Sequence, residues 1–147
     1  MRDTDAVPAK PLPPADGLAR EFYKWCGRGE LRFQRCLACN PWRHPPREMC
    51  PGCGAWEWEW DKAAGHGRVF SWTVATRALH PAFKSEVPYA AVVVEMDEGV
   101  RLLSWVLDCL PDELTIDVPV EVVFERVAEE VTLPYFRRAH HPNGGKE

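Results

Sequence analysis

Residues 36–53 read CLACNPWRHPPREMCPGC, and the four cysteines of this stretch decide how the rest of the chain is interpreted. Cys36 and Cys39 form one C-x2-C pair, and Cys50 and Cys53 form a second pair after ten intervening residues. A two-residue gap in a tight turn lets two sulfurs bind one ion, and two such turns complete a tetrahedral site. Because four thiolates leave no coordination position for water or substrate, we expect a structural metal. Zinc is the expected ion, and iron in the same geometry is the alternative.

A redox role is the competing interpretation of each C-x2-C pair. Such a dithiol normally begins a helix that follows a strand, whereas Pro51 and the connection NPWRHPPRE (residues 40–48) indicate knuckles and a loop. His44 lies between the pairs, and with four thiolates available we expect it to be a surface side chain. Cys26 and Cys109 have no local partner and are predicted to pack as small hydrophobic residues.

Length and composition limit the fold. The chain has 147 residues, 46% of them hydrophobic, which suffices for one domain or for a small module beside a larger one. Fourteen prolines and ten glycines argue against long helices and favour a strand-rich protein. The N-terminus lacks a signal-peptide pattern, and no stretch approaches the roughly 20 apolar residues that span a membrane. We therefore expect a cytoplasmic protein, in which six cysteines are more consistent with metal binding than with disulfides.

A short helix is predicted before the cysteines. Residues 1–15 are rich in proline and are expected to form a flexible arm. Asp16 offers an N-cap and Gly27 an end to the helix. One face between them carries three apolar residues, Leu18, Phe22 and Trp25. Because so short a helix is marginal alone, this face must pack on something; packing within the chain is favoured, and docking on a partner subunit is the alternative.

Two strands are predicted beside the cysteine pairs. LRFQRC (residues 31–36) leads into the first pair, and AWEWEW (residues 55–60) follows the second. In the second strand three tryptophans, Trp56, Trp58 and Trp60, alternate with glutamates, so they share one face. We favour this face as the core of a small metal module over a stacking platform for nucleic-acid bases.

Five further strands are predicted from Gly65 onward. They are GRVFSWTVATRAL (67–79), YAAVVVEM (89–96), VRLLSWVLD (100–108), VPVEVVFE (118–125) and VTLPYFRRA (131–139). Gly99 fits a three-residue hairpin loop, and Pro134 suits an edge strand. The predicted fold is mainly β: a helix and zinc ribbon over residues 16–62, a five-stranded OB-fold barrel over residues 63–139, and a flexible tail over residues 140–147.

The order of these motifs resembles the DUF35 family, whose members join a rubredoxin-like zinc ribbon to an OB-fold domain. The resemblance covers nearly everything from Asp16 to Ala139 and rests on GRGEL (27–31), FQRCLAC (33–39), PPREMCPGC (45–53), GRVFSWTV (67–74), HPAF (80–83), PYAAVVVEMDEGVRLLSWV (88–106), VPVEVVFE (118–125) and LPYFRRA (133–139). Two positions depart from the family. Asp117 and Asn40 stand where glycine is usual, and asparagine tolerates the left-handed conformation best among the other residues.

The resemblance implies an accessory, non-catalytic subunit of an acyl-CoA-processing complex. In such complexes a thiolase-fold partner, a thiolase, steroid side-chain aldolase or acyltransferase, supplies the catalytic residues, and a MaoC-like hydratase is a further partner. The DUF35 subunit organises the complex or helps to hold the CoA ester. The implied assembly is a heterotetramer with two copies of each subunit. In agreement, the sequence offers no catalytic triad, glycine-rich phosphate loop or paired carboxylates.

Candidate contact residues follow from charge and loop position. Between Arg20 and Arg47 there are seven basic residues and two acidic ones, a front that could meet phosphates or simply be solvated. The predicted CoA or acyl contacts are Arg35, Arg43, Arg47, Arg77, His80, Phe83 and Lys84. The predicted partner-docking residues are Leu18, Phe22, Trp25, Trp42 and His44. The loop from Asn40 to Met49 is the first region to mutate against a partner contact.

Two other functions stay open. Zinc ribbons and OB barrels both bind single-stranded nucleic acid, but the predicted second to fourth barrel strands and their loops are acidic, unlike a groove that follows phosphates. Their acidic residues are Glu95, Asp97, Glu98, Asp108, Asp112, Glu113, Asp117, Glu121 and Glu125. A stand-alone acyl-CoA enzyme is the third hypothesis.

Overall fold

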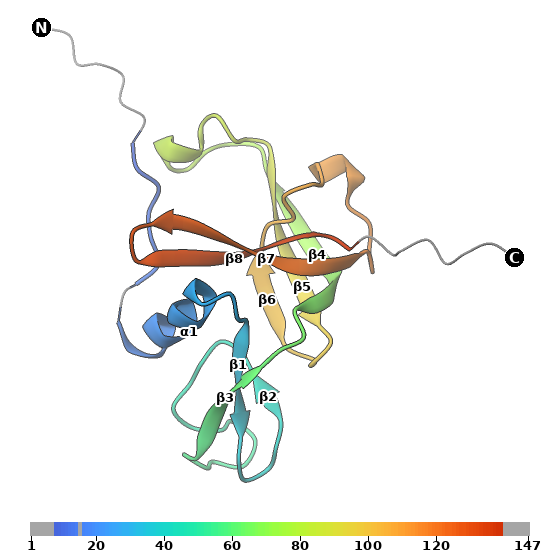
Figure 1. The fold of residues 1–147 in the computed structure, drawn as a ribbon. Helices are drawn as coiled ribbons and strands as arrows, with labels where there is room; N and C mark the ends of the chain where they lie inside the picture. Colours follow the sequence, from blue (N-terminus) through green and yellow to red (C-terminus); the bar gives the residue numbers. More distant parts are fainter. Residues whose placement is uncertain (1–7, 15, 140–147) are drawn as a thin grey trace, which may run out of the picture.

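The computed structural model describes residues 8–14 and 16–139. Within these ranges the chain folds into two antiparallel sheets and one α-helix (Figure 1). The ribbon comprises β1 (Arg32–Cys36), β2 (Trp42–Arg43) and β3 (Trp58–Lys62), after the helix α1 (Gly17–Gly27). The barrel comprises β4 (His66–Ala75), β5 (Tyr89–Met96), β6 (Arg101–Ser104), β7 (Pro119–Ala128) and β8 (Val131–Arg138). Short 3-10 turns, η1 (Pro81–Phe83) and η2 (Pro111–Glu113), lie in the loops after β4 and β6. Within the two described ranges, no helix has the length and apolar character that crossing a membrane requires.

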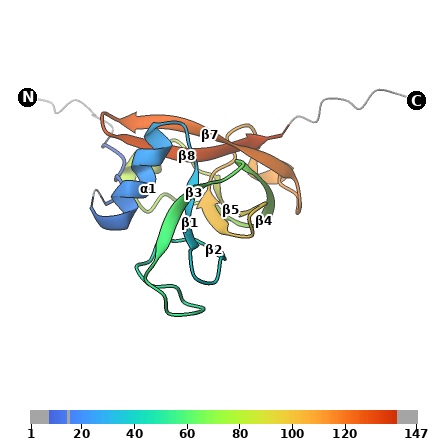
Figure 2. The ribbon, with the colours of Figure 1, turned by 60° about the horizontal axis from the view of Figure 1, so that its bottom comes forward.

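The five-stranded sheet closes into an OB-fold barrel. Its strand order is β6-β5-β4-β7-β8, and each paired neighbour is antiparallel. The two ends meet where Val106, just after β6, forms a parallel bridge to Phe136 of β8. There the Phe136 N–H donates to the Trp105 carbonyl at 2.9 Å, and the Leu107 N–H donates to the Phe136 carbonyl at 2.8 Å. The predicted mainly β class and five-stranded barrel are confirmed; Figure 2 shows the ribbon projecting from one side of the barrel.

Local sequence signals account for the turns and the edge of this sheet. The β5–β6 hairpin has a loop of three residues, Asp97 to Gly99, and Gly99 has a φ of 92°. This left-handed conformation favours glycine, as predicted. β8 ends the sheet order, and Pro134 lies within it. The Pro134 carbonyl accepts a hydrogen bond from the Ser104 hydroxyl at 2.7 Å across the closing seam.

One apolar core runs from the helix through the base of the ribbon into the barrel. Its members include Phe22, Phe33, Val69, Val94 and Phe136, each less than 5% exposed. α1 lies against β8, so packing of the helix within the chain is confirmed (Figure 1). Cys26 is 1% exposed in this core, and burial raises its pKa to about 12, which keeps the thiol neutral. The helix, the ribbon base and the barrel therefore form one packing unit.

The tryptophan strand differs from its prediction. β3 begins at Trp58, and Trp56 is 65% exposed ahead of it. Residues 55–57 instead pair with the cysteine turns, since the Ala55 carbonyl accepts from the Cys50 N–H at 2.8 Å and the Glu57 carbonyl accepts from the Leu37 N–H at 3.0 Å. Trp60 packs against the core, with Trp58 edge-on to it at 5.3 Å between ring centroids. The expected core role therefore holds for Trp60 and is wrong for Trp56.

The predicted terminal segments are only partly within the described residues. Residues 1–7 and 15 of the expected arm, and the whole expected tail 140–147, lie outside them. Residues 8–14 have no regular secondary structure. They are held to the barrel by Lys10, whose Nζ lies 2.6 Å from Glu86 Oε1 in the loop between β4 and β5.

Candidate functional site

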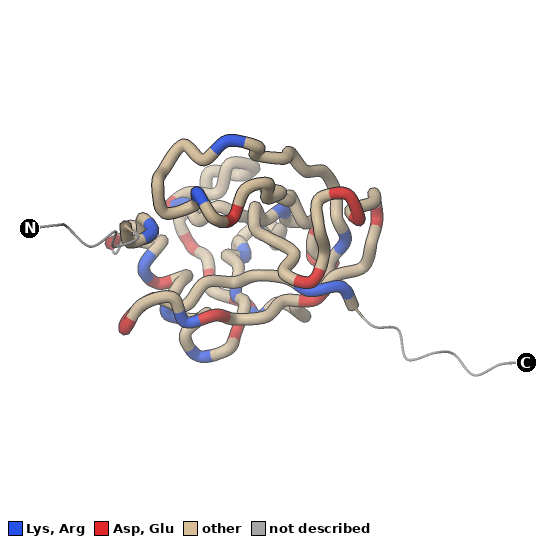
Figure 3. Tube along the Cα trace, turned by 90° about the horizontal axis from the view of Figure 1, so that it is seen from above, with Lys and Arg blue, Asp and Glu red and all other residues tan. Residues whose placement is uncertain are grey.

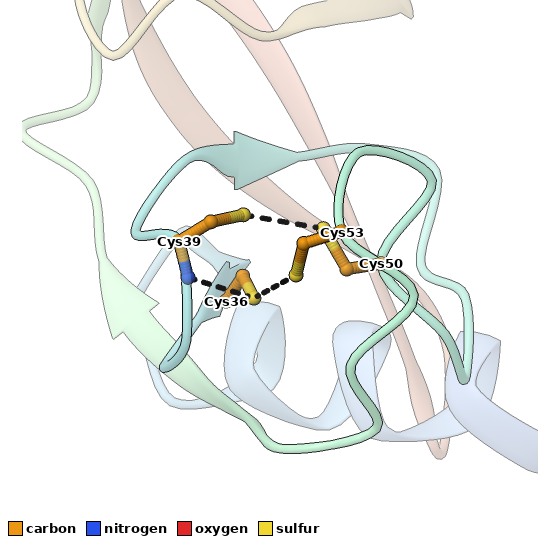
Figure 4. Close-up of side chains that lie close together, drawn as sticks. All are labelled: Cys36, Cys39, Cys50 and Cys53. Atoms are coloured by element: carbon orange, nitrogen blue, oxygen red, sulfur yellow. Dashed lines mark hydrogen bonds between the residues drawn. The ribbon is translucent and has the colours of Figure 1, made fainter.

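The four cysteines converge from two turns of the ribbon, as Figure 4 shows. Their sulfur atoms all lie within 4.8 Å of one another. Cys36 Sγ is 3.7 Å from Cys53 Sγ, and Cys39 Sγ is 3.6 Å from Cys50 Sγ. Four sulfurs bound at about 2.3 Å around one tetrahedral ion lie roughly 3.8 Å apart. The observed separations fit a single four-coordinate ion.

The two turns share one backbone pattern. In the first turn the Asn40 N–H donates to the Cys36 carbonyl at 3.0 Å, and in the second the Gly54 N–H donates to the Cys50 carbonyl at 2.9 Å. Asn40 and Gly54 both adopt left-handed conformations, with φ of 79° and 76°. Each therefore occupies the position directly after a cysteine pair where the chain must reverse. The asparagine of this sequence fills the role of the family's glycine, as predicted.

Backbone amides stabilise two of the thiolates. The Cys39 N–H lies 3.5 Å from Cys36 Sγ and is the main cause that lowers the pKa of Cys36 to about 6. The N–H groups of Cys53 and Gly52 lower the pKa of Cys50 in the same way. For Cys39 the hydrogen bond with the Cys53 sulfur, followed by burial and the other sulfurs, raises the pKa to about 12. A cation bound by the four sulfurs would favour their ionised form, which fits the metal site that their geometry indicates.

A buried polar cluster fixes the loop between the cysteine pairs. Gln34 Oε1 accepts hydrogen bonds from Arg43 Nε at 2.8 Å and from the Arg47 N–H at 2.7 Å. Arg43 Nη2 donates to the Arg47 carbonyl at 2.8 Å. Arg43 is only 8% exposed, so it is not free to meet CoA phosphates as predicted. The sequence interpretation missed Gln34, whose only signal is a polar residue next to Phe33 in a short buried strand.

His44 is not the surface side chain that we expected. Its ring lies 5.0 Å from the ring of Phe22 and 5.2 Å from that of Phe33, measured between centroids. Burial lowers the pKa of His44 to about 4, so the imidazole is neutral near pH 7. Phe22 itself is 4% exposed. Both residues belong to the contact between helix and ribbon. Phe22 is buried there and is not available for docking as predicted, whereas His44 is half-buried and its docking role stays a prediction.

The other predicted docking residues are half-buried and stay candidates. Leu18 and Trp25 lie on α1, and Trp42 lies on β2. The guanidinium of Arg32 stacks over Trp25 at 4.2 Å, and that of Arg35 lies over Trp42 at 5.4 Å. These cations cover part of each indole face.

Two of the seven basic residues of the predicted front have ion pairs within the described residues. Arg32 pairs with Glu30 at 2.9 Å, and Arg35 pairs with Asp61 at 3.0 Å. Arg47 is exposed and stays a candidate CoA contact. Figure 3 shows basic and acidic residues interspersed over the molecule rather than segregated. This distribution does not form a continuous basic groove.

The barrel loops carry a cluster of rings that we call the aromatic face. Its members are His80, Phe83, Tyr89, Trp105 and Tyr135, with neighbouring centroids 5.0 to 6.2 Å apart. The predicted contacts His80 and Phe83 are brought together here, whereas Arg77 and Lys84 point into solvent in the same loop. A cavity of about 260 Å³, lined by Tyr89, Trp105 and mostly aliphatic residues, adjoins the face. The sequence interpretation did not find Tyr89, Trp105 and Tyr135, because they come from separate strands.

Lys10 lies over the aromatic face. Its Nζ is 5.5 Å from the ring centroid of Phe83 and 5.7 Å from that of Trp105. His80 has a local structural role as well, since its Nδ1 accepts from the Ala82 N–H at 3.1 Å at the start of η1.

Comparison with known families matches both parts of the chain. A model described as the rubredoxin-like zinc ribbon domain of ChsH2 matches residues 26–59, and one described as the C-terminal OB-fold domain of ChsH2 matches residues 60–125. A DUF35 domain-containing scaffold protein of Methanothermobacter thermautotrophicus is 38% identical over 104 residues, which cover 70% of this chain and 77% of that protein. A probable enoyl-CoA hydratase alpha subunit of Thermomonospora curvata is 38% identical over 143 residues. These cover 94% of this chain but only 44% of that relative.

A solved structure also matches the chain in both sequence and fold. The chain superposes on a chain of the Ltp2-ChsH2(DUF35) aldolase with a TM-score of 0.78 and 38% identity, covering 86% of this chain and 98% of the other. The four-cysteine ribbon and the OB barrel follow one another here as in the two matched domain models. On this evidence the chain belongs to the DUF35 family.

Proposed function

We propose that this chain is a zinc-binding, non-catalytic subunit of an acyl-CoA-processing complex. In this proposal a thiolase-like partner carries the catalytic residues. The complex is proposed to act in the cytoplasm, the location expected from the sequence. The observation that carries the proposal is the likeness to the DUF35 chain of the Ltp2-ChsH2(DUF35) aldolase, over 98% of that chain. The name of the Thermomonospora curvata hydratase subunit supports acyl-CoA chemistry. This chain spans 44% of that relative, and a MaoC-like hydratase is proposed as a further partner.

The proposed metal is zinc with a structural role. Four thiolates saturate a tetrahedral ion, so the ion stabilises the turns and has no position for a reacting water. Metal analysis of the purified chain should give about one zinc per chain. A folded protein with clearly substoichiometric metal, or with iron in place of zinc, would contradict this assignment.

We place the partner contact on the ribbon tip, which we define as residues 36–57. Three large apolar side chains, Leu37, Met49 and Trp56, are 59%, 46% and 65% exposed there. Leu37 and Met49 adjoin a cysteine, and Trp56 follows Ala55, whose carbonyl accepts from the Cys50 N–H, so a bound metal would hold the backbone of all three rigid. Apolar anchors on a rigid element lose little entropy on binding, and tryptophan is the residue most often found at the centre of interfaces.

We place the CoA ester along the aromatic face. Rings can stack on the adenine or cover the pantetheine arm, and the adjoining cavity is apolar enough for part of an acyl chain. Arg77 and Lys84 lie in the same loop and are exposed, so they are placed to meet phosphates. From the ribbon, the exposed Arg47 stays a candidate, and so does the half-buried Arg35 with its ion pair to Asp61.

Co-expression tests the complex directly. The chain is produced with the thiolase-like or hydratase protein encoded beside its own gene, and we expect co-purification as a heterotetramer. Trp56→Ser should weaken the complex about tenfold or more while zinc is retained. Leu103→Ser is the matched control, because Leu103 is an equally exposed apolar residue at 67% but lies on the barrel strand β6. A chain that stays alone with every such neighbour would refute the subunit proposal.

A further inference from the structure

Arg43 carries a buried charge without a carboxylate partner. Gln34 and Arg43 are the two buried polar side chains of the core in the described residues. None of the ion pairs within 8–14 and 16–139 includes Arg43. The guanidinium donates to two neutral oxygens, and its Nη1 is buried without an acceptor there. Neutral oxygens satisfy hydrogen bonds but leave the charge uncompensated, which is costly in a protein interior.

The strand register places this charge beside the metal ligands. Arg43 is the cross-strand partner of Gln34, and Trp58 is the cross-strand partner of Cys36. Residues directly opposite share a face of the sheet, and so do residues two apart in one strand. Arg43 therefore lies on the face that carries Cys36, one row away. Its Cζ is 5.9 Å from the ring centroid of Trp58, the partner of Cys36.

The metal centre supplies the missing negative charge. Four thiolates around a divalent ion leave two negative charges in excess, of which the backbone N–H groups at Cys36 and Cys50 offset a part. Arg35 lies on the opposite face and is paired with Asp61, and Arg47 is exposed and screened by solvent. We propose that Arg43, oriented by Gln34 and the Arg47 carbonyl, is the buried counter-charge of the metal–tetrathiolate centre. The inference rests on the proposed metal site.

In the iron-loaded chain, the effect of the counter-charge can be measured as a change in the midpoint potential of the iron. Ferric iron with four thiolates has one excess negative charge and ferrous iron has two, so a nearby cation favours the reduced form. Arg43→Met should lower the midpoint potential of the iron-loaded chain, and Arg43→Lys should keep it close to that of the unmodified chain. Gln34→Glu places a carboxylate at the Arg43 Nε contact and should lower the potential with the arginine still present.

The zinc-loaded chain gives a second readout. Transfer of zinc to a chelator should be about tenfold or more faster for Arg43→Met than for the unmodified chain, the range seen when groups outside the ligand shell are removed. Arg43→Lys should restore most of the slow transfer. Arg35→Gln, which removes a half-buried charge that is paired with Asp61 on the opposite face, is the matched control and should leave both the potential and the transfer rate nearly unchanged.

The outcomes separate the counter-charge from a packing role. Only protein with the thiolate-to-iron charge-transfer spectrum is compared; if Arg43→Met does not load, the potential of Gln34→Glu decides. Equal potentials and transfer rates for the unmodified, Met and Lys chains overturn the inference. Equal loss of metal in the Met and Lys variants also overturns it, because packing then explains the effect. If the unmodified chain binds neither zinc nor iron, the metal site itself is refuted. This result differs from metal-loaded variants whose potentials and transfer rates equal those of the unmodified chain.

Discussion

The ribbon tip and the barrel are held together by different forces. In the barrel, Val69, Val94, Val120 and Phe136 are fully buried, and the strands close into a continuous hydrogen-bonded wall. In the ribbon tip, β2 is two residues long, and the buried side chains are two cysteines and Arg43. A segment this small cannot bury enough apolar surface to offset its loss of conformational entropy. The barrel folds on its core, whereas the tip depends on an ion.

The two regions meet at the base of the ribbon. Phe33 of β1 and Phe22 of α1 belong to the barrel's core, and His44 of the tip packs against both rings. The dependence on metal should therefore end near this contact.

Loss of a metal ligand should have the largest effect. Cys50→Ser removes one of four sulfurs, and zinc binding in comparable sites contributes on the order of 10 kcal/mol. We expect the zinc content to fall towards zero and the amide NMR signals of residues 36–57 to lose their dispersion. Signals from β4 to β8 should keep theirs, and Cys109→Ser is the control outside the site. Collapse of the barrel signals in Cys50→Ser would show that the two regions do not differ in this way.

Truncation of the barrel core should lower the stability of the barrel without removing the metal, the reverse of what we expect for Cys50→Ser. Phe136 is fully buried where the barrel closes, and Phe136→Ala should lower the free energy of unfolding by about 3–5 kcal/mol. Phe136→Leu keeps most of the volume and should cost less than about 1.5 kcal/mol. Denaturant unfolding measures both. The zinc content of the folded fraction should stay at one per chain. Zinc loss from folded Phe136→Ala would show that the ribbon tip depends on the barrel core as well as on the metal.

Acid should loosen the contact between the regions through His44. The folded-state pKa of His44 is about 4, below the value of about 6.5 expected for the unfolded chain. The unfolded chain therefore binds the proton first as the pH falls, so stability is fully present above pH ~6.5 and is lost down to pH ~4. The loss is up to about 3 kcal/mol from this group.

Acid also protonates the thiolates, so the comparison must isolate His44. His44→Phe keeps a ring against Phe22 and Phe33 but cannot titrate. The difference in unfolding free energy between this variant and the unmodified chain should grow as the pH falls from 6.5 to 4. A constant difference over that range would contradict the buried neutral imidazole.

The smallest expected effect concerns the turn before β7. Asp117 has a φ of 67° where the family commonly has glycine, and its N–H donates to the Val69 carbonyl at 2.9 Å. Asp117→Gly removes the left-handed strain and should raise the unfolding free energy by about 0.5–1 kcal/mol. Asn40→Gly makes the same change in the ribbon tip and should leave barrel unfolding unchanged. A loss of stability in Asp117→Gly would mean that the carboxylate makes a stabilising contact.

Patterns with a short range were predictable from sequence. The two C-x2-C pairs specify their own geometry, because each turn brings its two sulfurs together and only the distance between the turns is left open. The hairpin at Gly99 depends on neighbouring residues, and it was found where expected. The errors concern residues whose environment is set by a distant segment. Trp56 was expected in the core and is exposed, Arg43 was expected at the surface and is buried, and His44 was expected at the surface and is half-buried.

The sequence by itself determined the metal ligands, the five barrel strands and the left-handed turn residues, because ligand spacing, residue alternation and backbone strain act within a few positions of the chain. The tertiary structure decided which polar groups are buried. Gln34 accepts hydrogen bonds from Arg43 and Arg47 and so fixes the loop that contains them, and Phe22 of the helix packs against His44. It also decided the aromatic face, where rings from the β4–β5 loop, β5, β8 and the chain after β6 meet only once the barrel has closed. Burial depends on the summed contacts of segments far apart in the chain, and no local pattern encodes that sum.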